Sequence, residues 1–174
     1  IMMINPFLHH IGYNSFEIST AGKLFGAISA IVGGLIASYI MKKKSIFDSL
    51  LIFGSIHATC HILYIAQEFY GKDITFLFII TGFEGMTGGM TMAAYIAFIA
   101  SLCDGKFRAT QYSFFSSMMG LSRSIFPTIS GYIVSYLGWS MFFIFTILCT
   151  IPALILILYL EKHQKLNNQN NPDD

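Results

Sequence analysis

Among the residues of this chain that could do chemistry, Glu84 is the most informative because of where it stands. It lies in the glycine-rich run Gly82–Gly89, inside a segment that is otherwise largely apolar from Ile74 to Leu102. An ionisable side chain at membrane depth costs about 3 kcal/mol or more, so such a residue usually marks a solute or proton path or has a partner of opposite charge. Glu84 is therefore a candidate for binding and releasing protons during transport.

Two cations, Arg123 and Lys23, are the next candidates. Arg123 lies inside the following apolar segment, and Lys23 lies near the start of the first one. At a rise of about 1.5 Å per residue, Glu84 should lie roughly 15 Å from one membrane face and Arg123 roughly 16–20 Å from the other, hence near the same depth. Two interpretations stay open for them: a structural ion pair that fixes helix register, or a cavity in which Arg123 receives a substrate carboxylate. Lys23 could attract an anionic solute, or it could anchor its helix by reaching to the membrane surface.

The motif H-x-x-C-H, formed by His57, Cys60 and His61, has a spacing that zinc sites use. The two histidines share one helix face because they are four residues apart. However, no nearby aspartate or glutamate completes a ligand set, and Asp48 is more than two helical turns away. We therefore expect polar packing inside a helix bundle rather than a metal site, and we predict no cofactor.

The composition places the chain outside the class of soluble domains. Of its 174 residues, 55% are hydrophobic and 11% are charged, whereas soluble domains have about 25% charged residues. The net charge of +1 gives no support for nucleic-acid binding. The sequence has no G-x-S-x-G, no phosphate-binding glycine loop and no H-E-x-x-H motif, so we predict that it is not an enzyme. Energy for transport would come from an ion gradient or from a partner.

The elements that must position these residues are membrane-spanning helices. Crossing the apolar core of a bilayer takes about 20 apolar residues. The stretch of residues 1–11 is too short to span and resembles the end of a sixth helix, and residues 161–174 are predicted to be a disordered tail. We therefore predict an all-α membrane protein in which residues 1–160 form one transmembrane unit. Its five predicted spans are Ser19–Met41, Asp48–Ala66, Ile74–Leu102, Tyr112–Leu137 and Trp139–Leu160.

Basic residues give the predicted orientation of these spans. They occur in alternate loops, at Lys42–Lys44, at Lys106 and Arg108, and at Lys162 and Lys165. Cytoplasmic loops are enriched in lysine and arginine. The N-terminus is therefore predicted outside, in the periplasm, and the C-terminus inside, in the cytoplasm.

Small residues recur at every fourth position in three of the spans and predict close helix packing. In a bilayer, helices associate where small side chains let their backbones approach. Such faces could be static packing seams, or seams that slide as a carrier changes state. The residues are Gly22, Gly26, Ala30, Gly34 and Ser38 in the first span, Gly85 and Gly89 in the third, and Ser116, Gly120 and Ser124 in the fourth.

Three sequence blocks resemble the AmpG-type muropeptide permeases of the major facilitator superfamily. The first is G-F-E-G-M-T-G-G-M-T-M-A-A-Y-I-A-F from Gly82, the second is K-F-R-A-T-Q-Y-S from Lys106, and the third is G-L-S-R ending at Arg123. A less specific block, G-Y-I-V-S-Y-L-G-W-S-M-F-F from Gly131, is common to many members of that superfamily. The resemblance covers about residues 5–160 and the carboxyl-terminal half of the family only.

The resemblance implies a function as well as a fold. It implies proton-coupled uptake of anhydromuropeptides across a bacterial inner membrane for peptidoglycan recycling. The chain would be either a gene fragment of such a carrier or one subunit of a split carrier, with a separate amino-terminal half as its partner. The resemblance also places Glu84 toward the cavity and the histidines His57 and His61 at the periphery. The alternative is a membrane remnant or accessory protein that has no transport activity of its own.

Overall fold

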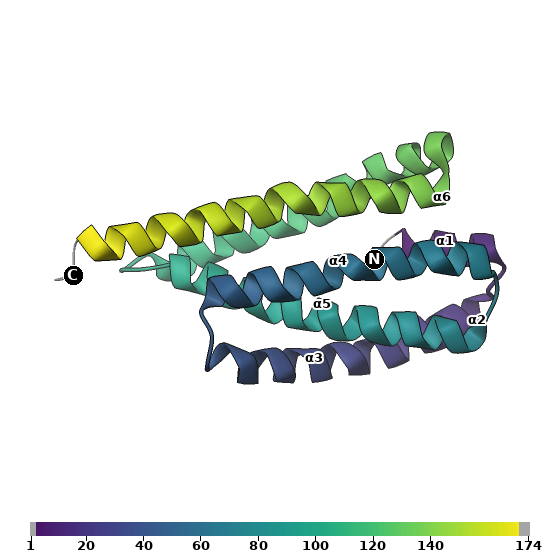
Figure 1. The fold of residues 1–174 in the computed structure, drawn as a ribbon, viewed down its shortest axis with the longest axis horizontal. Helices are drawn as coiled ribbons and strands as arrows, with labels where there is room; N and C mark the ends of the chain where they lie inside the picture. The colour runs from purple at the N-terminus through teal and green to yellow at the C-terminus, as the bar shows by residue number, and fades with distance from the viewer. Residues whose placement is uncertain (1–2, 171–174) are drawn as a thin grey trace.

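The computed structural model describes residues 3–170, apart from the side chains of residues 126–128 and 164–170. Within that part the secondary structure is helical, without a strand, and the prediction of an all-α fold is confirmed. Helices α3, α4 and α5 run side by side, and α6 lies next to α4 (Figure 1). The elements are α1 (Ile4–Ile11), α2 (Ser15–Ile18), a π-helical segment (Ser19–Phe25), α3 (Gly26–Met41), α4 (Ile46–Tyr70), α5 (Ile74–Leu102) and α6 (Arg108–Asn170).

Helix α6 consists of two antiparallel arms that meet at Gly138. The backbone of Gly138 is not helical, with φ 79° and ψ 174°, and glycine adopts such a positive φ without a steric penalty. Figure 1 shows the chain reversing there, so that the second arm runs back along the first. The two predicted spans on either side of Gly138 therefore lie on separate arms.

Four helical segments of the described chain are long and apolar enough to cross a membrane. The predicted span 112–137 lies in the first arm of α6 and is not among them as a separate segment. That arm is more polar than the others, since it carries a run of serines and Arg123. Helix α6 extends to Asn170, into the stretch that we predicted as a disordered tail, while residues 171–174 lie outside the described part. The four segments are Ser15–Met41, Ile46–Tyr70, Ile74–Leu102 and Ile129–His163.

Helices α3 and α5 pack backbone against backbone through small residues. A Cβ added at Gly33 would lie 2.8 Å from the carbonyl carbon of Met86, and one added at Gly89 would lie 2.8 Å from that of Ala30. Real Cβ atoms essentially never come within 3.0 Å of such atoms. The predicted close packing of these two helices is therefore present, and it needs glycine at both positions.

The register of this contact differs from the predicted one. Beyond Ala30 the buried small residues are Gly33 and Ala37, whereas Gly34 faces open space and Ser38 is exposed. A helix has 3.6 residues per turn, so a stripe drawn at every fourth position drifts off the contact face within a few turns. The contact between α3 and α5 instead follows the helical period of 3.6 residues.

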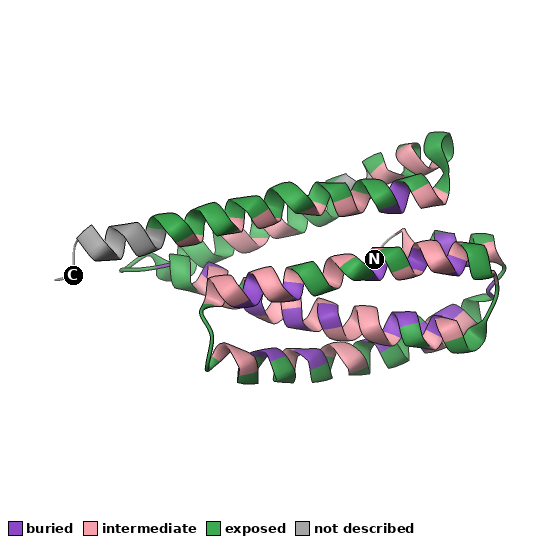
Figure 2. Ribbon diagram, in the orientation of Figure 1, coloured by how far each residue is buried: buried purple, intermediate pink, exposed green. Residues whose placement is uncertain are grey.

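The larger of two hydrophobic clusters among the described residues lies at the end of the bundle that holds α1. There the ring of Phe7 lies 4.9 Å from that of Phe143 and 5.9 Å from that of Tyr64, and the rings of Tyr64 and Phe143 are stacked at 5.5 Å. These contacts join α1, α4 and the second arm of α6. Exposed residues, by contrast, run along the outer sides of α3 and α6 (Figure 2), as expected for helices that face lipid.

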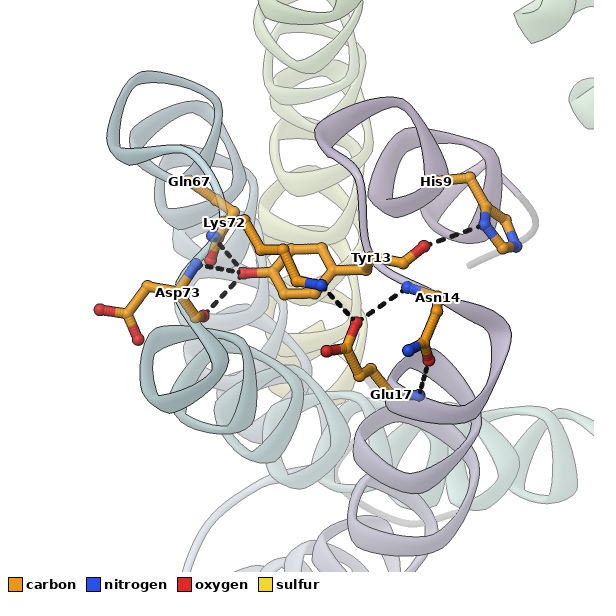
Figure 3. A network of polar contacts seen from close by, with 7 residues as sticks. All are labelled: His9, Tyr13, Asn14, Glu17, Gln67, Lys72 and Asp73. Atoms are coloured by element: carbon orange, nitrogen blue, oxygen red, sulfur yellow. Dashed lines mark hydrogen bonds and ion pairs between the residues drawn. The ribbon is translucent and has the colours of Figure 1, made fainter.

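A polar network fastens the turn after α1 to the turn between α4 and α5 (Figure 3). The buried Tyr13 hydroxyl donates to the carbonyl oxygen of Asp73 at 2.7 Å, and it accepts from the Asp73 backbone N–H at 2.8 Å and from Gln67 Nε2 at 2.9 Å. Beside it, Lys72 Nζ and Glu17 Oε2 form an ion pair at 2.9 Å. Burial raises the pKa of the Tyr13 hydroxyl, because the charged phenolate loses its solvent.

Candidate functional site

A cavity of about 840 Å³ lies against α5 and contains both of the charged residues expected there. Glu84 and Arg123 line it from α5 and from the first arm of α6. Glycines of α3 and α5, together with Thr91 and Tyr95, form much of the remaining wall. A second cavity of about 470 Å³ lies between α1, α4 and α6, and it is also lined by Glu84 and Arg123.

Glu84 has a specific hydrogen-bond donor. The hydroxyl of Tyr64, on α4, donates to Glu84 Oε2. The Tyr64 ring contacts the rings of Phe7 and Phe143, which also contact each other. One carboxylate oxygen of Glu84 is thus positioned by a buried aromatic side chain, while the residue still lines both cavities.

Arg123 is near Glu84 but is not its ion-pair partner. Its Nη2 atom donates to the sulfur of Met92 at 3.5 Å, a weak interaction. Among the side chains that the structure describes, no N–O contact within 4.0 Å joins Arg123 to a carboxylate. The structural ion pair that the sequence left open is therefore not formed in this structure, and the guanidinium is available to the cavity.

The H-x-x-C-H motif forms a polar layer between α4 and α5. Thr87 lies at its centre, with its hydroxyl 3.1 Å from His57 Nδ1 and 3.2 Å from Cys60 Sγ. No group of three or more potential metal ligands occurs among the described residues. His61 lines the second cavity, whereas His57 lines both, so His57 is not at the periphery as the resemblance had implied.

Lys23 is the candidate that the structure does not bring to the others. It lies in the π-helical segment before α3 and is exposed. It lines neither of the two cavities, although its neighbour Gly22 lines the larger one. Its position fits a side chain that reaches to the membrane surface.

Tyr64, Thr87 and Met92 contact the candidate residues directly, and the sequence did not single them out. A signal was present on α4, since His57, Cys60, His61 and Tyr64 follow each other at helical spacing and therefore share one face. Their partners on α5 depend on how far the two helices slide past one another. That offset cannot be read from either segment alone.

Comparison with known proteins gives the family. The sequence profile of the Major Facilitator Superfamily matches residues 1–173 of the chain. The chain belongs to this superfamily. Its membership agrees with the helical, apolar architecture and with two charged residues that line one cavity. It indicates a multi-pass membrane transporter family rather than an enzyme family.

Relatives from Rickettsia narrow the resemblance further. The chain is 62% identical over 160 residues to the protein of Rickettsia bellii named "Putative transporter AmpG 1", covering 92% of this chain and 39% of the relative. It is 36% identical over 162 residues to "Putative transporter AmpG 2" of Rickettsia felis, covering 93% of this chain and 40% of the relative. The chain thus spans about two fifths of the length of these curated relatives. The similarity to AmpG-type proteins that the sequence blocks indicated is confirmed.

Proposed function

We propose that this chain is the carboxyl-terminal part of a proton-coupled transporter that takes up anhydromuropeptides for peptidoglycan recycling. The observation that carries the proposal is the shared cavity, in which Glu84 and Arg123 lie without neutralising each other. Uncompensated charges inside an apolar bundle are costly and are retained where a solute or an ion uses them. The AmpG names of the relatives and the resemblance of the glycine-rich block support the class of solute.

Each charged residue has a role in this proposal. Arg123 receives an anionic group of the solute, since guanidinium binds carboxylates through paired N–H donors. Glu84 accepts and releases the coupled proton, and Tyr64 holds its carboxylate by the hydrogen bond to Oε2. Lys23 lies outside both cavities and has a subordinate role, the electrostatic attraction of an anionic solute.

The proposed orientation has the N-terminus in the periplasm and the C-terminus in the cytoplasm, in a bacterial inner membrane. The α3–α4 turn, the α5–α6 loop and the C-terminal end lie at one end of the bundle (Figure 1). This end carries Lys42–Lys44, Lys106, Arg108 and Lys162, and an excess of lysine and arginine marks the cytoplasmic side. In the same proposal, residues 1–160 form the transmembrane half and residues 161–174 form a cytoplasmic tail.

Uptake of a labelled anhydromuropeptide tests the proposal in a strain that lacks its own muropeptide permease. The chain is expressed alone, and together with an amino-terminal half taken from a full-length relative. We expect uptake above background only when both parts are present, because the solute path of the superfamily lies between two halves.

The controls of this experiment separate transport from expression. Both proteins are quantified in the membrane fraction, and an unrelated membrane protein replaces one partner in a parallel strain. Absence of uptake with both halves inserted would reject the proposal and favour the alternative, a membrane protein with no transport activity of its own.

A further inference from the structure

A third cavity, of about 520 Å³, lies where α5 ends and α6 begins, away from Glu84 and Arg123. Three small residues, Ala100, Cys103 and Ala109, leave the space, and Lys106, Arg108 and Tyr112 complete its lining. We propose that this cavity binds the phosphate headgroup of an anionic phospholipid. The proposal is independent of solute transport.

The charge of the cavity is uncompensated. Both Lys106 and Arg108 are exposed. Among the described side chains, the ion pair of Lys72 with Glu17 is the one observed, so neither cation has a carboxylate within 4.0 Å. The nearest acidic residue in the sequence, Asp104, does not line the cavity, and its Oδ1 atom accepts from the N–H of Gly105 at 2.6 Å. Two cations are therefore free to meet an anion from outside the protein.

Backbone geometry adds to this positive potential. Arg108 is the first residue of α6, and its N–H donates to the carbonyl oxygen of Gly105 at 3.4 Å. In the same first turn the N–H groups of Ala109 and Thr110 have no backbone partner among the described residues, as is usual at the start of a helix. These groups and the helix dipole favour an anion near the N-terminus. A phosphate in the cavity would meet two cationic side chains and this helix end together.

The apolar surroundings favour a lipid over a soluble phosphate. Three large apolar residues are close in the sequence to residues that line the cavity, and all are exposed: Leu102 by 52%, Phe107 by 74% and Phe114 by 63%. Acyl chains would cover such side chains, and a soluble phosphate would not. Clusters of lysine and arginine at the cytoplasmic ends of membrane helices interact with anionic headgroups.

Native mass spectrometry of the purified chain in detergent tests the proposal with defined lipids. Phosphatidylglycerol is titrated against the chain, with phosphatidylcholine as the zwitterionic lipid and glycerol phosphate as the soluble phosphate. We expect one high-occupancy phosphatidylglycerol adduct. In Lys106→Gln/Arg108→Gln its affinity should fall at least about tenfold, because each basic residue near a membrane phosphate contributes about fivefold.

The matched control is Lys42→Gln/Lys44→Gln, which removes the same charge at the same end of the bundle but outside the cavity. We expect this variant to lose less than about threefold, with Lys106→Arg/Arg108→Lys retaining most of the affinity. An equal loss in both double glutamine variants would overturn the proposal, since the attraction would belong to the whole basic end. Equal binding of phosphatidylcholine, or of glycerol phosphate, would overturn it as well. Circular dichroism of each variant confirms that the helices are intact.

Discussion

At the scale of single residues, the surroundings of Glu84 limit what it can do. Tyr64 donates a hydrogen bond to one of its oxygens, but no cation among the described residues pairs with it. A donor of this kind can stay bonded to a carboxylate or rotate when the carboxyl group takes up a proton. The Tyr64 ring also contacts Phe7 and Phe143. If Glu84 exchanges the coupled proton as proposed, a change in its bond with Tyr64 would be felt in the packing of α1 and α6.

Replacing Glu84 by glutamine keeps the shape of the side chain but removes its ability to exchange a proton. In a carrier reassembled from both halves, we expect Glu84→Gln to bind solute but to take it up at the same rate with and without an inward proton gradient. The measurement is uptake into vesicles at a series of external pH values. Glu161→Gln, a charge-matched change outside both cavities, should keep the wild-type pH profile. An unchanged profile in Glu84→Gln would remove this residue from proton coupling.

At the scale of helices, the length and hydropathy of segments predicted most of the architecture. The turn at Gly138 was also foreseeable, because G-W separates two apolar runs and a positive φ there suits glycine. The contact face of α3 was predicted imperfectly, since Gly34 was expected in it and Gly33 takes its place. The contacts of Thr87 with His57 and Cys60 depend on how far α4 and α5 are offset along their axes. The pattern of side chains within one helix does not encode that offset.

The adjacent glycines of α3 allow a matched test of this packing. A Cβ at Gly33 would collide with the backbone of Met86, whereas nothing lies within 4 Å of one at Gly34. We expect Gly33→Val to lower the free energy of unfolding by about 1–3 kcal/mol or more, as overpacked cores do. Gly34→Val should change it by less than about 0.5 kcal/mol. Thermal unfolding in detergent, followed by circular dichroism, gives both values, and equal losses would contradict the assigned register.

At the scale of the whole molecule, the Tyr13 network joins segments that are distant in the sequence. It links the turn after α1 to the turn before α5, about sixty residues along the chain, and the ion pair of Lys72 with Glu17 reinforces it. The α5–α6 loop and the basic turns lie at the opposite end (Figure 1). One end is thus held by a polar network, and the other carries cations that form no ion pair with a described side chain, so the two ends of the bundle differ chemically.

Removing the Tyr13 hydroxyl should therefore weaken the whole bundle. In Tyr13→Phe the amide of the buried Gln67 and the N–H of Asp73 lose an acceptor, and an unsatisfied buried donor costs about 1–3 kcal/mol. Tyr136→Phe is the control, because Tyr136 is 87% exposed and should lose less than about 0.5 kcal/mol. Equal unfolding temperatures for Tyr13→Phe and the wild type would show that the network does not hold the two turns together.

The pH dependence of stability gives a second and independent signature of the same hydroxyl. Burial raises the pKa of Tyr13 above its ordinary value of 10.0, so the unfolded chain releases this proton at a lower pH than the folded chain. The protonated Tyr13 hydroxyl therefore makes its full contribution to the free energy of unfolding below pH 10. This contribution is lost as the pH rises from there through the pKa of Tyr13 in the folded chain. In alkaline unfolding we therefore expect the wild type to lose stability above pH 10 more steeply than Tyr13→Phe. Parallel curves would mean that Tyr13 ionises equally in both states, and hence that burial does not disfavour its phenolate in the folded chain.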